Sequence, residues 1–245
     1  LFAVEALEDE VVDRLPGFKK RLSWFLENRG DLARHITCLA RSSGRATPHR
    51  LLAVPSRGRL ERLLGYLFDE QEFLSPYGVR SLSRVHESQP FSFWTNGNEH
   101  RVDYTPGESA SGMFGGNSNW RGPIWFPLNW LIVEALQRYH YFYRDGFQVE
   151  VPTGSGNFVT LDVAAREIQR RLAQLFLPDA SGQRACHGSD RRWADDAAFR
   201  ELVLFHEFFH GDTGQGLGAS HQTGWTALVA QCLEGVATGR VRGER

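Results

Sequence analysis

The spacing of apolar residues along this chain predicts helices over about half of its length. Apolar side chains recur every three or four positions in the segments 57–73, 162–176 and 195–210, with polar side chains on the opposite faces. The segment 124–143 is apolar and aromatic nearly all round, which predicts a buried helix. Further helices are expected over the segments 2–14, 18–28 and 225–233.

Strand-like segments are short, and long loops separate the helices. Strands are expected only at 51–54 and 34–39, whereas the segments 75–122 and 146–156 are rich in glycine and aromatic residues. Loops of this length in a compact domain usually carry function. Helix pairs joined by long loops on one side predict an all-α fold, a toroid of helical hairpins with the loops along one rim.

Charge and cysteine usage exclude several classes of function. The 28 Lys and Arg residues nearly balance the 29 Asp and Glu residues, leaving a net charge of −1, so no basic surface for nucleic acid is expected. No apolar run approaches the ~18 residues that a membrane-spanning helix needs. The cysteines, Cys38, Cys186 and Cys232, have no C-x-x-C spacing, which indicates a reducing compartment, here the cytoplasm, and no disulfide framework. No cofactor is expected.

The seven tryptophans point to a carbohydrate ligand, because indole rings in loops form stacking clefts that suit the apolar faces of sugars. The chain begins at Leu1 within an apolar pattern and lacks an initiator methionine, so we expect a fragment whose N-terminal part is missing. A single domain is expected over residues 1–236. The basic, glycine-containing tail at 237–245 is expected to fray.

One short motif favours a zinc enzyme. His206-Glu-Phe-Phe-His210 matches H-E-x-x-H, in which two histidines one helical turn apart bind zinc and the glutamate acts as base. A catalytic zinc also needs a third protein ligand. The metzincin extension would place Gly at 213 and His at 216, where this chain has Thr213 and Gly216, and the first downstream glutamate is Glu234. A zinc-dependent hydrolase is therefore kept as an alternative, and the main prediction includes no metal.

Three segments together carry a resemblance to a known family. They are Phe-Leu-Ser-Pro-Tyr-Gly-Val-Arg-Ser-Leu-Ser at 73–83, the stretch 113–129 with its core Trp-Arg-Gly-Pro-Ile-Trp at 120–125, and the stretch 207–225. In their order and spacing they resemble the C-terminal half of the catalytic domain of glycoside hydrolase family 63, in its long bacterial branch. That family also contains the processing α-glucosidase and the mannosyl- and glucosylglycerate hydrolases.

The resemblance implies an (α/α)6 toroid and inverting hydrolysis of an α-glucoside or a related α-glycoside. Inversion uses an acid and a base carboxyl group that lie ~6.5–9.5 Å apart. The family's pattern for the base, Glu-x-aromatic-x-x-x-Thr-Gly, falls on Glu207, Phe209, Thr213 and Gly214, so Glu207 is the expected general base. The family's general acid lies some two hundred residues upstream. No acidic loop of that kind occurs in the first forty residues here, so the acid is expected in the missing N-terminal part.

The same resemblance suggests the substrate-binding residues, each with packing or structural pairing as the alternative role. Tryptophan faces suit sugar C–H surfaces, and the planar guanidinium of Arg121 suits sugar hydroxyls. The expected partners are an α-linked oligosaccharide or glycoside and the missing N-terminal half of the same toroid, with no nucleic acid and no membrane. A carbohydrate-binding remnant without catalysis is a second alternative. The candidate substrate-binding residues are Tyr77, Arg80, Trp120, Arg121, Trp125, Asn129, Gln222 and Trp225.

Overall fold

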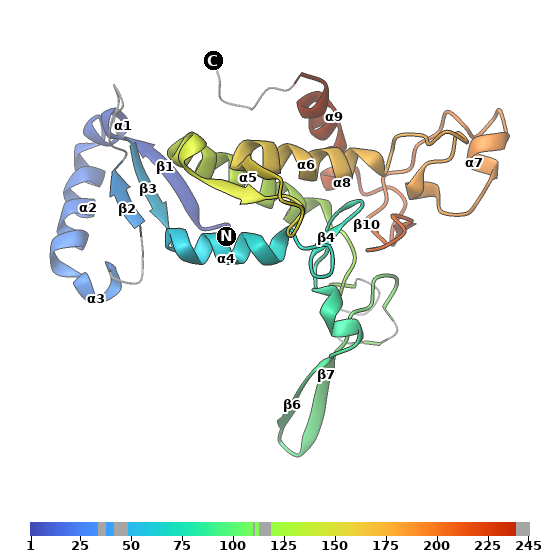
Figure 1. Cartoon of the computed structure of the whole chain (residues 1–245), viewed down its shortest axis with the longest axis horizontal. Helices are drawn as coiled ribbons and strands as arrows, with labels where there is room; N and C mark the ends of the chain where they lie inside the picture. The colour runs from blue at the N-terminus through green and yellow to red at the C-terminus, as the bar shows by residue number, and fades with distance from the viewer. Residues whose placement is uncertain (34–37, 42–48, 110, 113–118, 239–245) are drawn as a thin grey trace.

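The core of the protein is helical, as the apolar pattern predicts. A computed structural model describes residues 1–33, 38–41, 49–109, 111–112 and 119–238. The long helices α5 (Phe126–Tyr143) and α6 (Leu161–Gln174) pack against each other at its centre, and α9 (Val229–Thr238) packs on α6. Helix α4 (Arg57–Leu67) lies alongside this pair (Figure 1).

Helices α5 and α6 match their predicted segments closely. In α5 the buried residues lie on several faces and include Ile132, Leu136 and Tyr139, which explains why its sequence is apolar nearly all round. Helix α6 is amphipathic, and Asp162 in its first turn forms an ion pair of 2.9 Å with Arg166 one turn later.

Helix α4 is shorter than predicted and ends six residues before position 73. Leu60, Leu64 and Leu67 form its buried face, as expected. The helix stops because the next residues form a turn: the Asp69 carboxylate accepts the backbone N–H of Gln71 at 2.8 Å, and the Asp69 carbonyl accepts the N–H of Leu74. The following short strands β4 (Leu74–Ser75) and β5 (Gly78–Val79) pair in antiparallel fashion.

The predicted helix over residues 2–14 is wrong in its first half. Residues Val4–Glu8 form strand β1, which pairs with β3 (His49–Ala53), and β3 also pairs with β2 (Cys38–Arg41). The partner β3 lies far along the sequence and satisfies the backbone of β1, which local periodicity does not reveal. The predicted strand at 51–54 is confirmed within β3, and part of the one at 34–39 lies outside the described residues. The helices α1, α2 and α3 follow β1 at Asp9–Asp13, Pro16–Asn28 and Gly30–Ala33.

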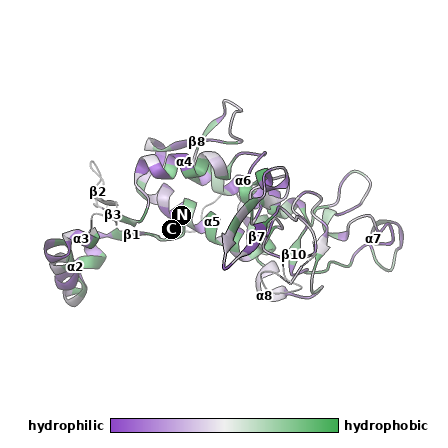
Figure 2. Ribbon diagram, turned by 90° about the horizontal axis from the view of Figure 1, so that it is seen from below, coloured by the Kyte–Doolittle hydropathy of each residue, from purple (hydrophilic) through white to green (hydrophobic). Residues whose placement is uncertain are grey.

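Helix α2 confirms the predicted segment 18–28 but buries none of its side chains. Phe18 and Trp24 remain exposed on it, and Figure 2 shows apolar and polar residues side by side along this helix. Val11 and Leu15, just before it in the chain, are also exposed. This end of the molecule therefore presents an apolar surface.

The long loop predicted at 75–122 contains a β-hairpin that projects from the body of the molecule (Figure 1). Strands β6 (Phe91–Thr95) and β7 (Asn98–Val102) are joined by Asn96 and Gly97, both with positive φ, as in a two-residue hairpin turn. Strands β8 (Gln148–Glu150) and β9 (Phe158–Thr160) form a further small hairpin. The fold is thus mainly helical rather than strictly all-α, with small antiparallel sheets at its periphery.

The predicted helix over residues 195–210 is wrong. Only the short helix α7 (Arg192–Asp195) forms there, and turns and loop lead to strand β10 (Phe208–Phe209), which pairs with β11 (Gly216–Leu217). Phe208 and Phe209 are both fully buried although they are adjacent, which suits an extended segment buried on two sides rather than an amphipathic helix. The segment 225–233 forms two helices, α8 (Thr223–Thr226) and the start of α9. Short 3-10 turns occur at Arg84–Glu87, Arg144–Gly146 and Ala185–His187.

Candidate functional site

The three segments that carry the resemblance lie side by side in the structure. Ile124, in the central segment, forms isolated bridges with both Arg80 and Phe209. Its backbone exchanges two hydrogen bonds with Phe209, at 2.8 and 3.0 Å, and the neighbouring Pro123 carbonyl accepts the N–H of Ser81. Segments far apart in sequence are therefore joined through Ile124.

Four aromatic side chains from these segments form one cluster. Trp125 stacks on Trp120 with ring centroids 3.9 Å apart and on Phe208 with centroids 4.8 Å apart, while Trp225 approaches it at 6.2 Å. Trp125 is 1% exposed and its indole N–H donates to the Asn119 carbonyl, whereas Trp120 is 40% exposed. Trp120 thus forms the accessible end of the stack, and Trp125 supports it from the core.

Glu207 lies in a loop directly before β10 and not at the end of a helix as predicted. Its backbone N–H donates to the Ala219 carbonyl at 2.8 Å, and its Oε2 accepts the Ala219 N–H at 3.2 Å. The Trp225 indole N–H donates to the Glu207 carbonyl at 2.9 Å. The half-buried carboxylate is therefore held by the glycine-rich loop at residues 211–219, and the backbone of Glu207 is bonded to Trp225 of the aromatic cluster.

The glycine-rich loop requires glycine where it passes Glu207. Gly218 has a φ of +67°, and a Cβ there would lie 2.8 Å from Oε2 of Glu207. A side chain would meet both backbone strain and the carboxylate. Nearer the start of the loop, the ring of Tyr77 lies against Gly214, so Tyr77 packs on the loop and supports it.

Arg80 lies in a buried network under the loop. Its guanidinium forms an ion pair of 3.0 Å with Asp212 and also donates to the Tyr104 hydroxyl and the Leu74 carbonyl. The Tyr104 hydroxyl donates to the same Asp212 oxygen at 3.0 Å, and burial raises the pKa of this phenol. Arg80 therefore makes the structural pairing that the sequence left open as its alternative to substrate binding.

Asn129 and Gln222 differ in how their side-chain amides are used. Asn129 is buried, accepts the N–H of Val79 at 2.7 Å and donates to the Val79 and Trp125 carbonyls, so its amide holds β5 onto α5. Gln222 precedes α8 and is half-buried. Within the described part of the chain its side-chain amide makes no hydrogen bond.

Arg121 is buried but incompletely satisfied. It is 6% exposed, its Nη2 donates to the Ser109 hydroxyl at 3.3 Å, and its Nε has no hydrogen-bond partner. No carboxylate of the described residues forms an ion pair with it. Since an unpaired buried guanidinium is costly, its spare donors suit oxygen atoms of a bound ligand.

The structure removes the geometric basis of the zinc alternative. His206 and His210 lie at the two ends of an extended segment and not one turn apart on a helix. The Nδ1 of His210 faces the backbone N–H groups of Asp212 and Thr213 at 3.2 and 3.3 Å. Nowhere in the part of the chain that is described do three His, Cys, Asp or Glu side chains gather in a way that could hold a metal ion.

His187, which is buried, and His206, which is half-buried, lie close to the glycine-rich loop. Burial lowers the pKa of His187 to about 4, with smaller contributions from Arg184 and His206, and burial also lowers the pKa of His206. Both histidines therefore favour the neutral form near pH 7. His187 lies 4.4 Å from the ring of Trp193, centroid to centroid.

One residue beside Glu207 was missed by the sequence analysis. Glu108 is exposed, and its Oε1 accepts the N–H of Gly218 at 3.2 Å. It lies in the predicted loop 75–122, where the sequence gives no signal of which loop residues approach Glu207.

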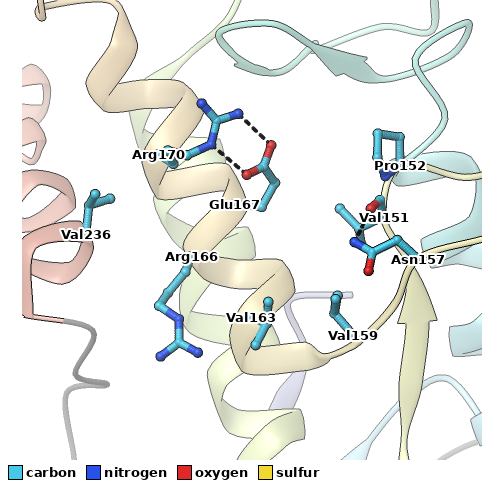
Figure 3. A pocket seen from close by; sticks show the side chains of 9 residues that line it. All are labelled: Val151, Pro152, Asn157, Val159, Val163, Arg166, Glu167, Arg170 and Val236. Atoms are coloured by element: carbon cyan, nitrogen blue, oxygen red, sulfur yellow. Dashed lines mark hydrogen bonds and ion pairs between the residues drawn. The ribbon is translucent and has the colours of Figure 1, made fainter. Parts of the chain in front are cut away.

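A separate depression of about 430 Å³ lies between α6, the β8–β9 hairpin and α9 (Figure 3). Its two arginines are already paired, Arg170 with Glu167 and Arg166 with Asp162. None of the predicted site residues lines it, so it forms no part of the candidate site.

The helical core, a loop-borne glutamate and stacked tryptophans are consistent with a carbohydrate-active enzyme, and comparison with known proteins identifies the class as glycoside hydrolase. The chain matches the family of the mannosylglycerate hydrolase MGH1-like glycoside hydrolase domain over residues 4–226 and belongs to it. This family is related to glycoside hydrolase family 63, so the resemblance is confirmed.

Three relatives are yeast proteins. The chain is 49% identical over 245 residues to the uncharacterised protein YMR196W of Saccharomyces cerevisiae, covering 99% of this chain and 22% of that protein. It is 28% identical to the mannosyl-oligosaccharide glucosidase of the same yeast, in an alignment that covers 76% of this chain and 16% of that protein. It is 27% identical to a probable mannosyl-oligosaccharide glucosidase of Schizosaccharomyces pombe, in an alignment that covers 72% of this chain and 15% of that protein. The chain thus spans less than a quarter of each relative, and none of them supports the bacterial branch.

Among the described helices, none combines the length and the apolar character needed to cross a membrane.

Proposed function

We propose that this domain supplies the general base and the aromatic platform of an inverting α-glycosidase. The observation that carries the proposal is that Glu207 is fixed beside the Trp120–Trp125–Trp225 cluster. A tryptophan face orients a sugar ring, and a carboxylate next to it removes a proton from the attacking water. Membership of the glycoside hydrolase family and the glucosidase names of two relatives support the same reaction.

The remaining parts of the proposal follow from the inverting mechanism and the family. Leaving-group protonation requires a second carboxyl group, which we place outside this chain, in another part of the same (α/α)6 toroid. Trp120 and Arg121 are the proposed substrate contacts, with Gln222 and Trp225 closing the sugar subsite. Four other candidates would support this site through packing or hydrogen bonds and not contact the substrate: Tyr77, Arg80, Trp125 and Asn129. The cytoplasmic location expected from the cysteines stays a prediction.

The test is a substitution in the complete polypeptide that carries this domain. Glu207→Gln keeps the shape of the side chain but cannot accept a proton from water, so hydrolysis of an α-glucoside should fall by at least ~10²–10⁴-fold. Substrate binding, measured by calorimetry with the inactive variant, should remain. The anomeric configuration of the first product, followed by proton NMR, should be inverted.

Glu201→Gln is the matched control, because Glu201 is an exposed glutamate of the same region that pairs only loosely with Arg200 at 3.7 Å. It should leave turnover unchanged. Near wild-type turnover of the Glu207→Gln variant would mean that the base lies elsewhere, and retained configuration would refute inversion.

A further inference from the structure

Two glutamates hold neighbouring backbone amides of the glycine-rich loop. The N–H of Gly218 donates to Oε1 of Glu108, and the N–H of Ala219 donates to Oε2 of Glu207, both at 3.2 Å. The two carboxylates come from segments that are distant in sequence. The two amides that they hold are adjacent in the backbone, and Gly218 has a φ of +67°.

The segment that carries Glu108 is anchored on its other side. The Asn119 side-chain amide donates to the carbonyls of Thr105 and Gly107 at 2.6 and 2.7 Å, and the Pro106 carbonyl accepts the N–H of Gly211. The hydroxyl of Ser109, directly after Glu108, accepts a hydrogen bond from Nη2 of Arg121. Glu108 therefore reaches the glycine-rich loop from an anchored segment that also contacts Arg121.

The geometry points to Glu108 as a positioning residue for the general base, an inference that rests on the proposed function. Residues 216–219 contain two glycines, so few side chains anchor this loop. If the Gly218 amide loses its acceptor, the adjoining Ala219 amide, which holds Oε2 of Glu207, can rotate away. A displaced carboxylate slows proton removal from water strongly, because general-base catalysis depends on a precise approach.

The inference is tested first without substrate. In the complete polypeptide, hydrogen–deuterium exchange of a peptide covering Gly218 and Ala219 should become about tenfold faster in Glu108→Ala, and should stay near wild type in Glu108→Gln, which keeps the oxygen acceptor. Glu99→Ala is the control, because Glu99 lies on the projecting hairpin and pairs with Trp94 across it. Unchanged exchange in Glu108→Ala would overturn the inference.

The second measurement separates positioning from substrate contact. We expect kcat on an α-glucoside to fall about tenfold in Glu108→Ala with KM within twofold of wild type, and to recover in Glu108→Gln. A raised KM with unchanged kcat would show that Glu108 touches the substrate, and faster exchange with unchanged kcat would leave it a loop support only; either result overturns the inference. Failure of the proposed function would appear separately, as full activity of Glu207→Gln while Glu108→Ala still alters amide exchange.

Discussion

At the scale of single residues, the same amino acid serves different roles according to its burial. Trp120 and Trp125 belong to one sequence motif and stack on each other, yet one is accessible and the other is fully enclosed. The sequence predicted both as sugar contacts, since the motif does not reveal which indole faces outward. Arg80 and Arg121 differ in a similar way, because only Arg80 has a carboxylate partner within the described residues.

Substitution of the two tryptophans should affect different properties, folding stability for Trp125 and oligosaccharide binding for Trp120. Trp125→Ala should destabilise the folded state by about 3–5 kcal/mol, because it removes a large enclosed side chain and leaves a cavity. Trp120→Ala should cost less than ~1 kcal/mol but weaken oligosaccharide binding, because its outer face is the proposed sugar platform. Urea denaturation followed by fluorescence measures the first effect and calorimetric titration the second. Equal destabilisation by both substitutions would contradict this division of roles.

At the scale of elements, local periodicity found the two long helices, whose backbone hydrogen bonds are local, and missed the segments that pair with distant strands. Helix α5 and helix α6 lie close to their predicted bounds, since their apolar faces repeat with the helical period. The segments at Val4–Glu8 and Phe208–Phe209 pair with strands that local pattern cannot identify. The motif selects Glu207 as the general base, which stays a prediction, while its setting was predicted wrongly as the end of a helix.

The glycine-rich loop beside Glu207 depends on glycine for space as well as for conformation. Gly218 and Gly154 both have positive φ, at +67° and +85°, but only Gly218 has neighbours within 4 Å of an added Cβ, among them Oε2 of Glu207. Gly154→Ala should therefore cost about 1 kcal/mol of backbone strain and leave turnover unchanged. Gly218→Ala should cost at least as much stability and also lower kcat by about tenfold or more, because it displaces the carboxylate.

Thermal unfolding and steady-state kinetics of both variants in the complete polypeptide distinguish these effects. If Gly218→Ala lowered stability but kept full turnover, the loop would not position Glu207.

At the scale of the whole molecule, the described chain combines an ordered helical core with apolar surfaces that it does not cover. Val11 and Leu15 are 43% and 51% exposed at the end that carries α1 and α2. Phe2 is 48% exposed near Leu67 and Trp125, and Trp94 is 71% exposed on the projecting hairpin. Contiguous apolar surface beyond a few hundred Å² usually marks a contact with another part of a protein. The coverage of less than a quarter of each fungal relative agrees with a domain that works within a longer polypeptide.

The 245-residue chain expressed alone should therefore be catalytically silent and prone to self-association. Silence is expected because inversion needs two carboxyl groups, and the proposed mechanism assigns only the base to this chain. Self-association is expected because the exposed apolar side chains at residues 2, 11 and 15 gain free energy when they leave water. Size-exclusion chromatography, binding of a hydrophobic dye and an α-glucoside assay measure the three properties. Replacing Phe2, Val11 and Leu15 by serine should reduce association without restoring activity, whereas a monomeric chain that hydrolyses the glucoside would place the acid within these residues.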